Sequence, residues 1–260
     1  NLKMKQAFEI EKLERVKNEN INEFKLRFFT NVSHELLTPL SIISCGIEEL
    51  NDKPGVDKTT LQSIWMNVNR LITLIKQLLD FRKIESGDMR LNIELTFIDE
   101  VFEKLKELFL PMAKRKNMEF YVTGKIDKAI YCDVEKIETI LTNLVSNAFK
   151  YSNEGGCIRV EYAVSDTAGK EFLEITVKDT GSGISEKEIE HIFDRFYQVN
   201  SVTGRTFGVG IGLHLVKNIV DLHQGTITVK SNPEGEGSVF TIRIPLNKHL
   251  QEAQEEEAVL

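Results

Sequence analysis

Two apolar stripes of helical period near the start of the chain constrain the fold most strongly. Members of the first stripe are separated by 4, 3, 4 and 3 residues: Leu36, Leu40, Ile43, Ile47 and Leu50. Such spacing places them on one face of an α-helix. Turn-forming residues at 51–55 end this helix, and a second helix repeats the pattern from 61 to 79. One hairpin cannot bury two such wide stripes alone, so we expect two copies to pair as a four-helix bundle, which predicts a homodimer.

The first of these helices carries a histidine just above a proline. Pro39 offers no N–H to the carbonyl of Glu35, so we expect the helix to bend below His34. Glu35, Thr38 and the freed carbonyl would then gather around one imidazole. Taken alone, the pattern favours an ordinary surface histidine on a kinked helix. Thr38 is equally well explained as a residue that bonds back to a helix carbonyl.

Composition excludes several classes of function. A formal net charge of -7 argues against a nucleic-acid partner. The three cysteines are isolated and form no metal-binding spacing with the histidines, which favours a reducing compartment and no zinc site. No apolar run is long enough to cross a bilayer. The charged segment 1–26 lacks glycine and proline, and we expect it to be a coiled-coil helix.

The composition changes after the hairpin. Residues 88–247 mix strand-like alternation with helical patterns, without regular βαβ order, which predicts an α+β sandwich. Asp133 is expected to cap a helix that runs to about Tyr151. The organisation is therefore a helix over 1–26, an all-α hairpin over 27–87, an α+β domain over 88–247 and an acidic tail over 248–260.

Four polar residues share one face of the helix that Asp133 caps. Asn143, Asn147, Lys150 and Tyr151 lie at i, i+4, i+7 and i+8. An amide oxygen can ligate Mg²⁺, an ammonium group can meet phosphate, and an aromatic ring can lie beside a base. The alternative is a solvated helix face, which the poor helix propensity of asparagine disfavours. The face therefore suits a nucleotide.

A second candidate site follows a strand. Asp179 comes directly after an apolar strand, and Gly181, Gly183 and Ile184 follow it. The glycines would allow a ligand to approach the backbone closely, while the carboxylate could accept a hydrogen bond from an exocyclic amine such as that of adenine. On its own, the segment fits a tight turn equally well.

Glycines also open the helix that begins near residue 211. Gly208, Gly210 and Gly212 alternate with apolar residues, and amides at a helix start favour phosphate. Residues 200–207 precede them and are predicted to form a mobile lid. Before the lid, the aromatic residues of segment 192–197 are most simply core packing, with Arg195 as an additional charge near phosphate.

In this order and spacing, the motifs resemble those of sensor histidine kinases. The segment 29–40 is similar to their phospho-acceptor box, and residues 143–151, 179–184 and 208–213 are similar to the boxes of their ATP-binding domain, which belongs to the gyrase, Hsp90 and MutL superfamily. The turn 235–240 resembles the last glycine box of that domain. The resemblance covers about residues 20–246 and is greatest to the kinase part of bacterial hybrid two-component sensors.

The resemblance implies roles for individual residues. His34 would be the nucleophile toward the γ-phosphate of ATP, Glu35 would hold its Nδ1–H, and Thr38 would orient water for a phosphatase reaction. Asn147 would ligate Mg²⁺ and Asp179 would bind the adenine amine. The remaining residues of the expected nucleotide site are Asn143, Lys150, Tyr151, Gly181, Gly183, Ile184, Arg195, Thr206, Gly208, Val209, Gly210, Ile211, Gly212 and Leu213.

Partners and location are also implied by the resemblance. We expect a homodimer, a response-regulator receiver domain as phosphoryl acceptor, an upstream sensor or membrane segment outside this chain, and a cytoplasmic location as part of an inner-membrane sensor. Leu37 departs from the phospho-acceptor box of the family, because most relatives carry Arg or Lys at this position. We expect the loss of this cation to affect the rate of phosphoryl transfer and the choice of partner.

Two other functions compete with the kinase. An ATP hydrolase of the same superfamily would need a glutamate one turn before the Mg²⁺-binding asparagine, and Asn143 cannot act as that base. A dimeric scaffold that binds nucleotide without transferring phosphate is disfavoured by the presence of His34, Glu35, Asn147 and Asp179.

Overall fold

The computed structural model describes residues 30, 32–50, 58–167, 169–198, 209–231 and 237–246. The expected coiled coil of 1–26, the lid at 200–207 and the tail of 248–260 lie outside these residues. The described chain divides into two compact units: one contains the residues up to Leu79 together with Val209, and the other contains the remaining residues from Asp80 onward. None of the described helices is both long enough and apolar enough to cross a bilayer.

The first unit is a helical hairpin. Its first helix covers residues 32–50, and its second, α2 (Lys58–Glu85), continues into the second unit. Gly46 lies where the two helices approach closely, because a Cβ added there would be 2.8 Å from Cγ1 of Ile64. Much of the apolar stripe remains exposed, including Leu40, Ile47 and Trp65. A surface of this kind is consistent with the predicted pairing of two hairpins.

The second unit is built on a mixed sheet of five strands in the order β2-β4-β5-β7-β6. The strands are β2 (Glu119–Gly124), β4 (Cys157–Thr167), β5 (Lys170–Asp179), β6 (Thr226–Ser231) and β7 (Ser238–Pro245). A separate antiparallel pair joins β1 (Glu94–Thr96) to β3 (Ile130–Cys132).

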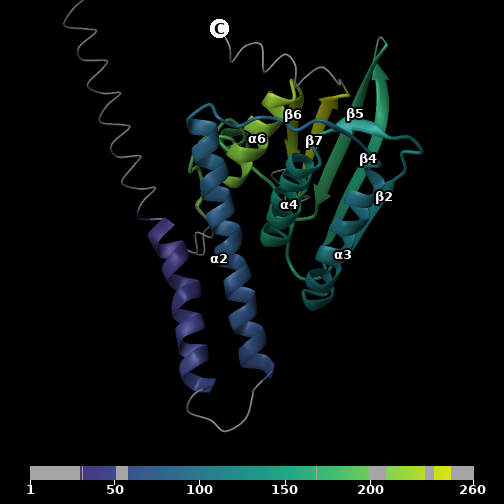
Figure 1. Cartoon of the computed structure of the whole chain (residues 1–260). Coiled ribbons are helices and arrows are strands. Elements are labelled where there is room, and N and C mark those ends of the chain that lie inside the picture. Colours follow the sequence, from purple (N-terminus) through teal and green to yellow (C-terminus); the bar gives the residue numbers. More distant parts are fainter. Residues whose placement is uncertain are drawn as a thin grey trace, which may run out of the picture. The chain divides into compact units, whose positions relative to one another are not determined.

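Three helices cover one face of this sheet (Figure 1). They are α3 (Asp99–Arg115), α4 (Val134–Tyr151) and α6 (Gly212–Leu222), and the short α5 (Glu186–Ile189) lies between β5 and α6 in the chain. Strand residues alternate, so that Val160, Ile175 and Ile242 are buried beneath the helices. Asp133 caps α4 as expected, since its side chain accepts a hydrogen bond from the backbone N–H of Lys136 at 3.0 Å.

The structure confirms an α+β domain and changes some of its predicted details. Strand β2 pairs in parallel with β4, because the chain between them crosses over through α4 and returns in the same direction. Among the described residues, only one turn of helix, α5, follows β5 before α6, and the first strand of the domain begins at Glu94. Strands β4 and β5 pair from Ile158 and Asp179 to Thr167 and Lys170, so the turn that joins them is short.

Candidate functional site

The predicted phospho-acceptor histidine lies on the first helix of the hairpin. His34 is exposed, and the hydroxyl of Thr38 donates a hydrogen bond to the His34 carbonyl at 3.0 Å. Pro39 is buried one residue later. The position of Thr38 is therefore the one expected of a threonine that bonds back along its helix, and its oxygen keeps lone pairs that can accept further hydrogen bonds.

Glu35 has a partner that the sequence reasoning missed. Nη2 of Arg70 on α2 donates to Oε2 of Glu35 at 2.8 Å. The side chain of Glu35 is only 13% exposed. Among the described residues, none forms a hydrogen bond with the imidazole of His34, and the carboxylate of Glu35 binds Arg70. Finding Arg70 from the sequence would have required the register between the helices, and helical period alone does not supply it.

The second unit contains a pocket of about 100 Å³ between α4, α6 and one end of the sheet. Six residues predicted for nucleotide binding line it: Asn147, Tyr151, Asp179, Gly183, Ile184 and Leu213. The other lining residues are Ala148, Ser182, Ile192, Tyr197, Gln198, Ser238 and Phe240. Segments that the sequence places far apart therefore meet around one cavity.

Asp179 is fixed at the end of β5 by the neighbouring backbone and by β7. Its Oδ1 accepts hydrogen bonds from the N–H of Gly181 at 2.8 Å and from the N–H of Ser238 at 3.3 Å. The hydroxyl of Ser238 donates to Oδ2 at 2.5 Å. Because Asp179 is only 5% exposed, these donors offset the cost of burying its carboxylate. A buried acceptor of fixed orientation at the rim of a pocket can select a ligand that offers an N–H group.

The polar face of α4 is divided between two environments. Asn147 reaches the pocket, whereas Asn143 is buried one turn earlier and its amide donates to the carbonyl of Thr139 at 2.8 Å. A Cβ added to Gly212 would lie 2.8 Å from Oδ1 of Asn143, so this asparagine packs against the start of α6. Of the four predicted residues of this face, the pocket lining includes Asn147 and Tyr151.

Lys150 and Tyr151 contact each other at the end of α4. The ammonium group of Lys150 donates to the hydroxyl of Tyr151 at 2.8 Å and lies 4.5 Å from the centre of its ring. Both residues are exposed, which allows the ammonium group to turn toward a bound anion.

The glycine segment before α6 is anchored to the loop after α5. Gly210 has a φ of 75°, and a Cβ there would lie 2.7 Å from the backbone of Phe196. The N–H of Phe196 donates to the carbonyl of Gly210 at 2.9 Å. Val209 and Ile211 are buried, and Leu213 faces the pocket. The predicted residues Thr206 and Gly208 lie outside the described residues.

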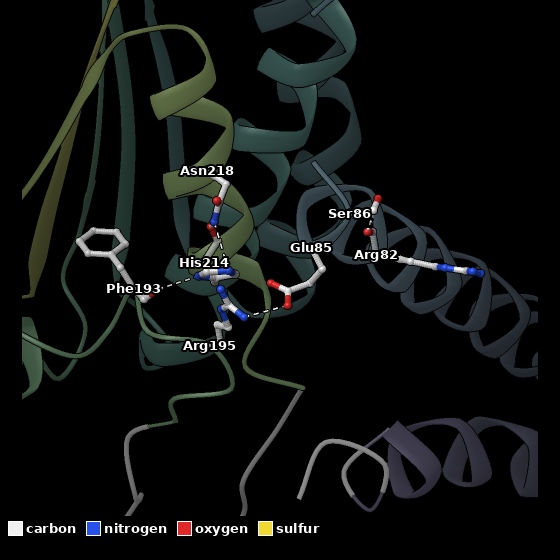
Figure 2. Close-up of polar contacts among 7 residues, drawn as sticks. All are labelled: Arg82, Glu85, Ser86, Phe193, Arg195, His214 and Asn218. Carbon is white, nitrogen blue, oxygen red and sulfur yellow. Dashed lines mark hydrogen bonds and ion pairs between the residues drawn. The ribbon is translucent and has the colours of Figure 1, made fainter. Parts of the chain in front are cut away.

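Arg195 lies outside the pocket lining and binds the last turn of α2. Its Nη1 donates to Oε2 of Glu85 at 2.8 Å, as Figure 2 shows. Beside this pair, the rings of Phe81 and Phe196 meet edge to face, with centroids 5.2 Å apart. His214 completes the cluster: its Nδ1 is 3.0 Å from the Phe193 carbonyl, and the Asn218 amide is 3.1 Å from its Nε2 (Figure 2). Donation to its Nε2 requires the neutral ring with its proton on Nδ1.

The architecture and the two sites define a class of protein: a helical hairpin that displays a histidine, joined to a nucleotide-binding α+β domain. Comparison with known proteins agrees. Residues 24–87 match the family model of the His Kinase A (phospho-acceptor) domain, and residues 132–248 match that of the histidine kinase-, DNA gyrase B-, and HSP90-like ATPase. The chain belongs to the sensor histidine kinases.

Individual relatives support this assignment. Histidine kinase P4 of Formosa agariphila is 35% identical over 97% of this chain, and hybrid signal transduction histidine kinase D of Dictyostelium discoideum is 35% identical over 91%. The chain spans only 19% and 16% of the length of these two relatives.

Solved structures share the fold. The histidine kinase AdeS of Acinetobacter baumannii has a TM-score of 0.58 and 28% identity, with 83% of this chain and 98% of AdeS covered. The histidine kinase ThkA, solved in complex with the response regulator TrrA, has a TM-score of 0.57 and 24% identity. That alignment covers 93% of this chain and 66% of ThkA.

Proposed function

We propose that this chain is a kinase core that transfers the γ-phosphoryl group of Mg-ATP to Nε2 of His34. The observation that carries the proposal is the combination of two parts in one chain. One part is an exposed histidine that precedes a proline on a helical hairpin. The other is a pocket lined by the buried residue Asp179 and by Asn147. Membership of the sensor histidine kinases supports the same reaction.

Asp179 would recognise the adenine base. Its carboxylate is fixed by three donors and still has lone pairs for one more hydrogen bond, which the exocyclic amine of adenine can supply. Tyr151 and Leu213 would contact the base or ribose from the pocket walls. Lys150, which is exposed at the end of α4, would turn toward the phosphates.

Further residues of the proposed nucleotide site act through the backbone or at its margin. Gly181, Gly183 and Ile184 would let the base approach the loop after β5. Thr206, Gly208, Val209, Gly210, Ile211 and Gly212 would shape the segment around the phosphates. Asn143 would support this segment from beneath, because it packs against Gly212. Arg195 would contribute charge only after leaving Glu85.

The pocket provides one protein oxygen that suits Mg²⁺. Asn147 supplies an amide oxygen, and no cluster of three or more carboxylate, histidine or cysteine side chains suitable for a metal occurs among the described residues. Mg²⁺ typically keeps several water ligands and binds through one or two protein oxygens plus substrate phosphates, so one asparagine is sufficient. When bound, the ion would neutralise charge on the phosphate oxygens.

In the proposed step, the lone pair of His34 Nε2 forms a bond to the γ-phosphorus while the bond to the bridging oxygen breaks. ADP leaves with that electron pair. The imidazole becomes positively charged, and the Nδ1 proton is stabilised by, or passes to, the carboxylate of Glu35. An imidazole needs no strong base for this reaction, because it requires only that the correct nitrogen be deprotonated.

Transfer onward to a receiver aspartate and a phosphatase activity belong to the same proposal. ThkA was solved with the response regulator TrrA, which supports a receiver as the partner. The hydroxyl oxygen of Thr38 can accept a hydrogen bond from water while it donates to the His34 carbonyl, which would allow it to orient a hydrolytic water.

The proposed assembly is a homodimer in which residues 27–87 form a four-helix bundle and residues 88–247 form the ATP-binding domain. Exposure of large apolar residues along the hairpin supports it. A segment 1–26 that transmits a signal, an upstream sensor and a cytoplasmic location complete the proposal, and the -7 net charge gives no support to a nucleic-acid partner.

Labelling with ATP tests the function directly. Incubation with Mg²⁺ and ATP labelled at the γ-phosphate should give a protein label that is lost in acid, stable in base and absent from His34→Ala. ATP labelled at the α-phosphate is the matched control and should leave the protein unlabelled. Free phosphate without labelled protein would instead indicate a hydrolase, and neither product would indicate a scaffold.

A further inference from the structure

Glu35 is held by the second helix of the hairpin rather than by the neighbouring histidine. Arg70 Nη2 lies 2.8 Å from Glu35 Oε2, and the glutamate side chain is 13% exposed while that of Arg70 is 42% exposed. A charged donor stabilises a carboxylate that is largely removed from water, so the pair favours the orientation of Glu35 toward α2.

This orientation separates the carboxylate from the imidazole. Side chains of consecutive residues in a helix diverge by roughly 100° around its axis. His34 is accordingly exposed, whereas Glu35 is directed toward α2. Within the described part of the chain, the imidazole of His34 forms no hydrogen bond, while Glu35 binds Arg70. For Glu35 to accept the Nδ1 proton, its side chain must turn away from α2.

We propose that Arg70 is a positioning residue that restrains the kinase reaction by holding Glu35 away from His34. The inference rests on the proposed function and deepens it. Two arrangements of one carboxylate compete, one bonded to Arg70 and one bonded to His34 Nδ1. Only the second stabilises the charge that forms on the imidazole as Nε2 bonds to phosphorus. Any signal that moves α2 relative to the first helix would therefore alter the rate through this pair.

The strength of the pair sets the size of the effect. An ion pair in which one partner is about half exposed holds a two-state equilibrium at about five to one. Loss of the guanidinium group should therefore raise the population of the reactive arrangement, and the rate at saturating ATP, by about five-fold. The KM for ATP should not change, because Arg70 and the nucleotide pocket lie in different units.

The experiment is a double-mutant cycle on full-length chain with labelled Mg-ATP. Arg70→Met should label His34 about five times faster than the parent, while Arg70→Met in a Glu35→Ala background should match Glu35→Ala alone. Lys76→Met is the control, since Lys76 is another exposed cation of α2 and its loss should leave the rate unchanged. Arg70→Lys keeps the charge but offers a single donor group, so its labelling rate should lie between those of the parent and Arg70→Met. This variant tests the inference if Arg70→Met fails to fold.

Each result has a defined meaning. A rate for Arg70→Met that equals or falls below the parent rate overturns the inference, as does an equal acceleration in the Glu35→Ala background. Absence of label in the parent itself would instead refute the proposed function. The two failures are therefore distinguishable.

Discussion

Replacing Asp179 with asparagine should separate recognition of the base from stability of the fold. Oδ1 of Asp179 receives the N–H groups of Gly181 and Ser238, and an asparagine oxygen can receive both. The new amide group would face the Ser238 hydroxyl, which can accept instead of donate. The variant should therefore fold, and its melting temperature should change little.

The nucleotide, in contrast, loses its acceptor. The adenine amine would face another N–H donor, and a hydrogen bond to a charged group typically contributes about 1.5–3 kcal/mol. Affinity for ATP should therefore fall roughly 10- to 150-fold. ITP carries a carbonyl oxygen in place of the amine, so the parent should bind ITP more weakly than ATP, and Asp179→Asn should remove or reverse that preference.

Titration calorimetry with both nucleotides is the assay, with Asp166→Asn as the matched control. Asp166 lies at the far end of the β4 and β5 hairpin, where it accepts the N–H of Gly169. Equal affinity of Asp179→Asn and parent for ATP, in a folded variant, would show that this carboxylate does not bind the base. An unchanged preference between ATP and ITP would lead to the same conclusion.

Three further predictions concern pH, backbone and thiol chemistry. Burial lowers the pKa of His223, whose Nε2 has no hydrogen bond among the described residues. The unfolded chain therefore binds more protons than the folded chain, and the free energy of unfolding should fall as pH drops below about 6.5. Urea unfolding should show that the stability of His223→Leu depends less on pH between about pH 5 and 7 than that of the parent. Gly210→Ala should destabilise the segment before α6 by about 1–2 kcal/mol or more, because φ is 75° at this position and Phe196 leaves no room for a Cβ. Nucleotide titration of this variant should show weaker binding than in the parent. Burial also raises the pKa of Cys132 to about 12, so mass spectrometry after iodoacetamide treatment should find exposed Cys45 alkylated well before Cys132.

The sequence predicted elements well where one physical signal dominates. The helical spacing of apolar residues located the two helices of the hairpin. Asp133 marked the start of α4, because capping depends on local chemistry alone. The parallel pairing of β2 with β4 could not be predicted, since the pairing partner of a strand depends on contacts distant in sequence.

The residues of the candidate site also divide into those that the local sequence identifies and those that depend on distant contacts. Asp179 and Asn147 were selected by residue type and spacing, and both line the pocket. Ser238 carried a weaker signal, as a residue of a glycine-rich turn, and its bond to Asp179 depends on the pairing of β5 with β7. The bond between Arg70 and Glu35 depends on how two helices are offset, and the spacing along either helix contains no information about that offset.

The attachment of Asp179 to β7 has a consequence for synthesis of the chain. Asp179 ends β5, yet two of its three hydrogen bonds come from Ser238, which begins β7, the last of the described strands in sequence order. Phe240 of that strand also lines the pocket. A ribosome-bound chain that has exposed all of β5 and α6 therefore still lacks one wall of the cavity. The pocket can be completed only after β7 has left the exit tunnel, which makes it one of the last features of the domain to mature.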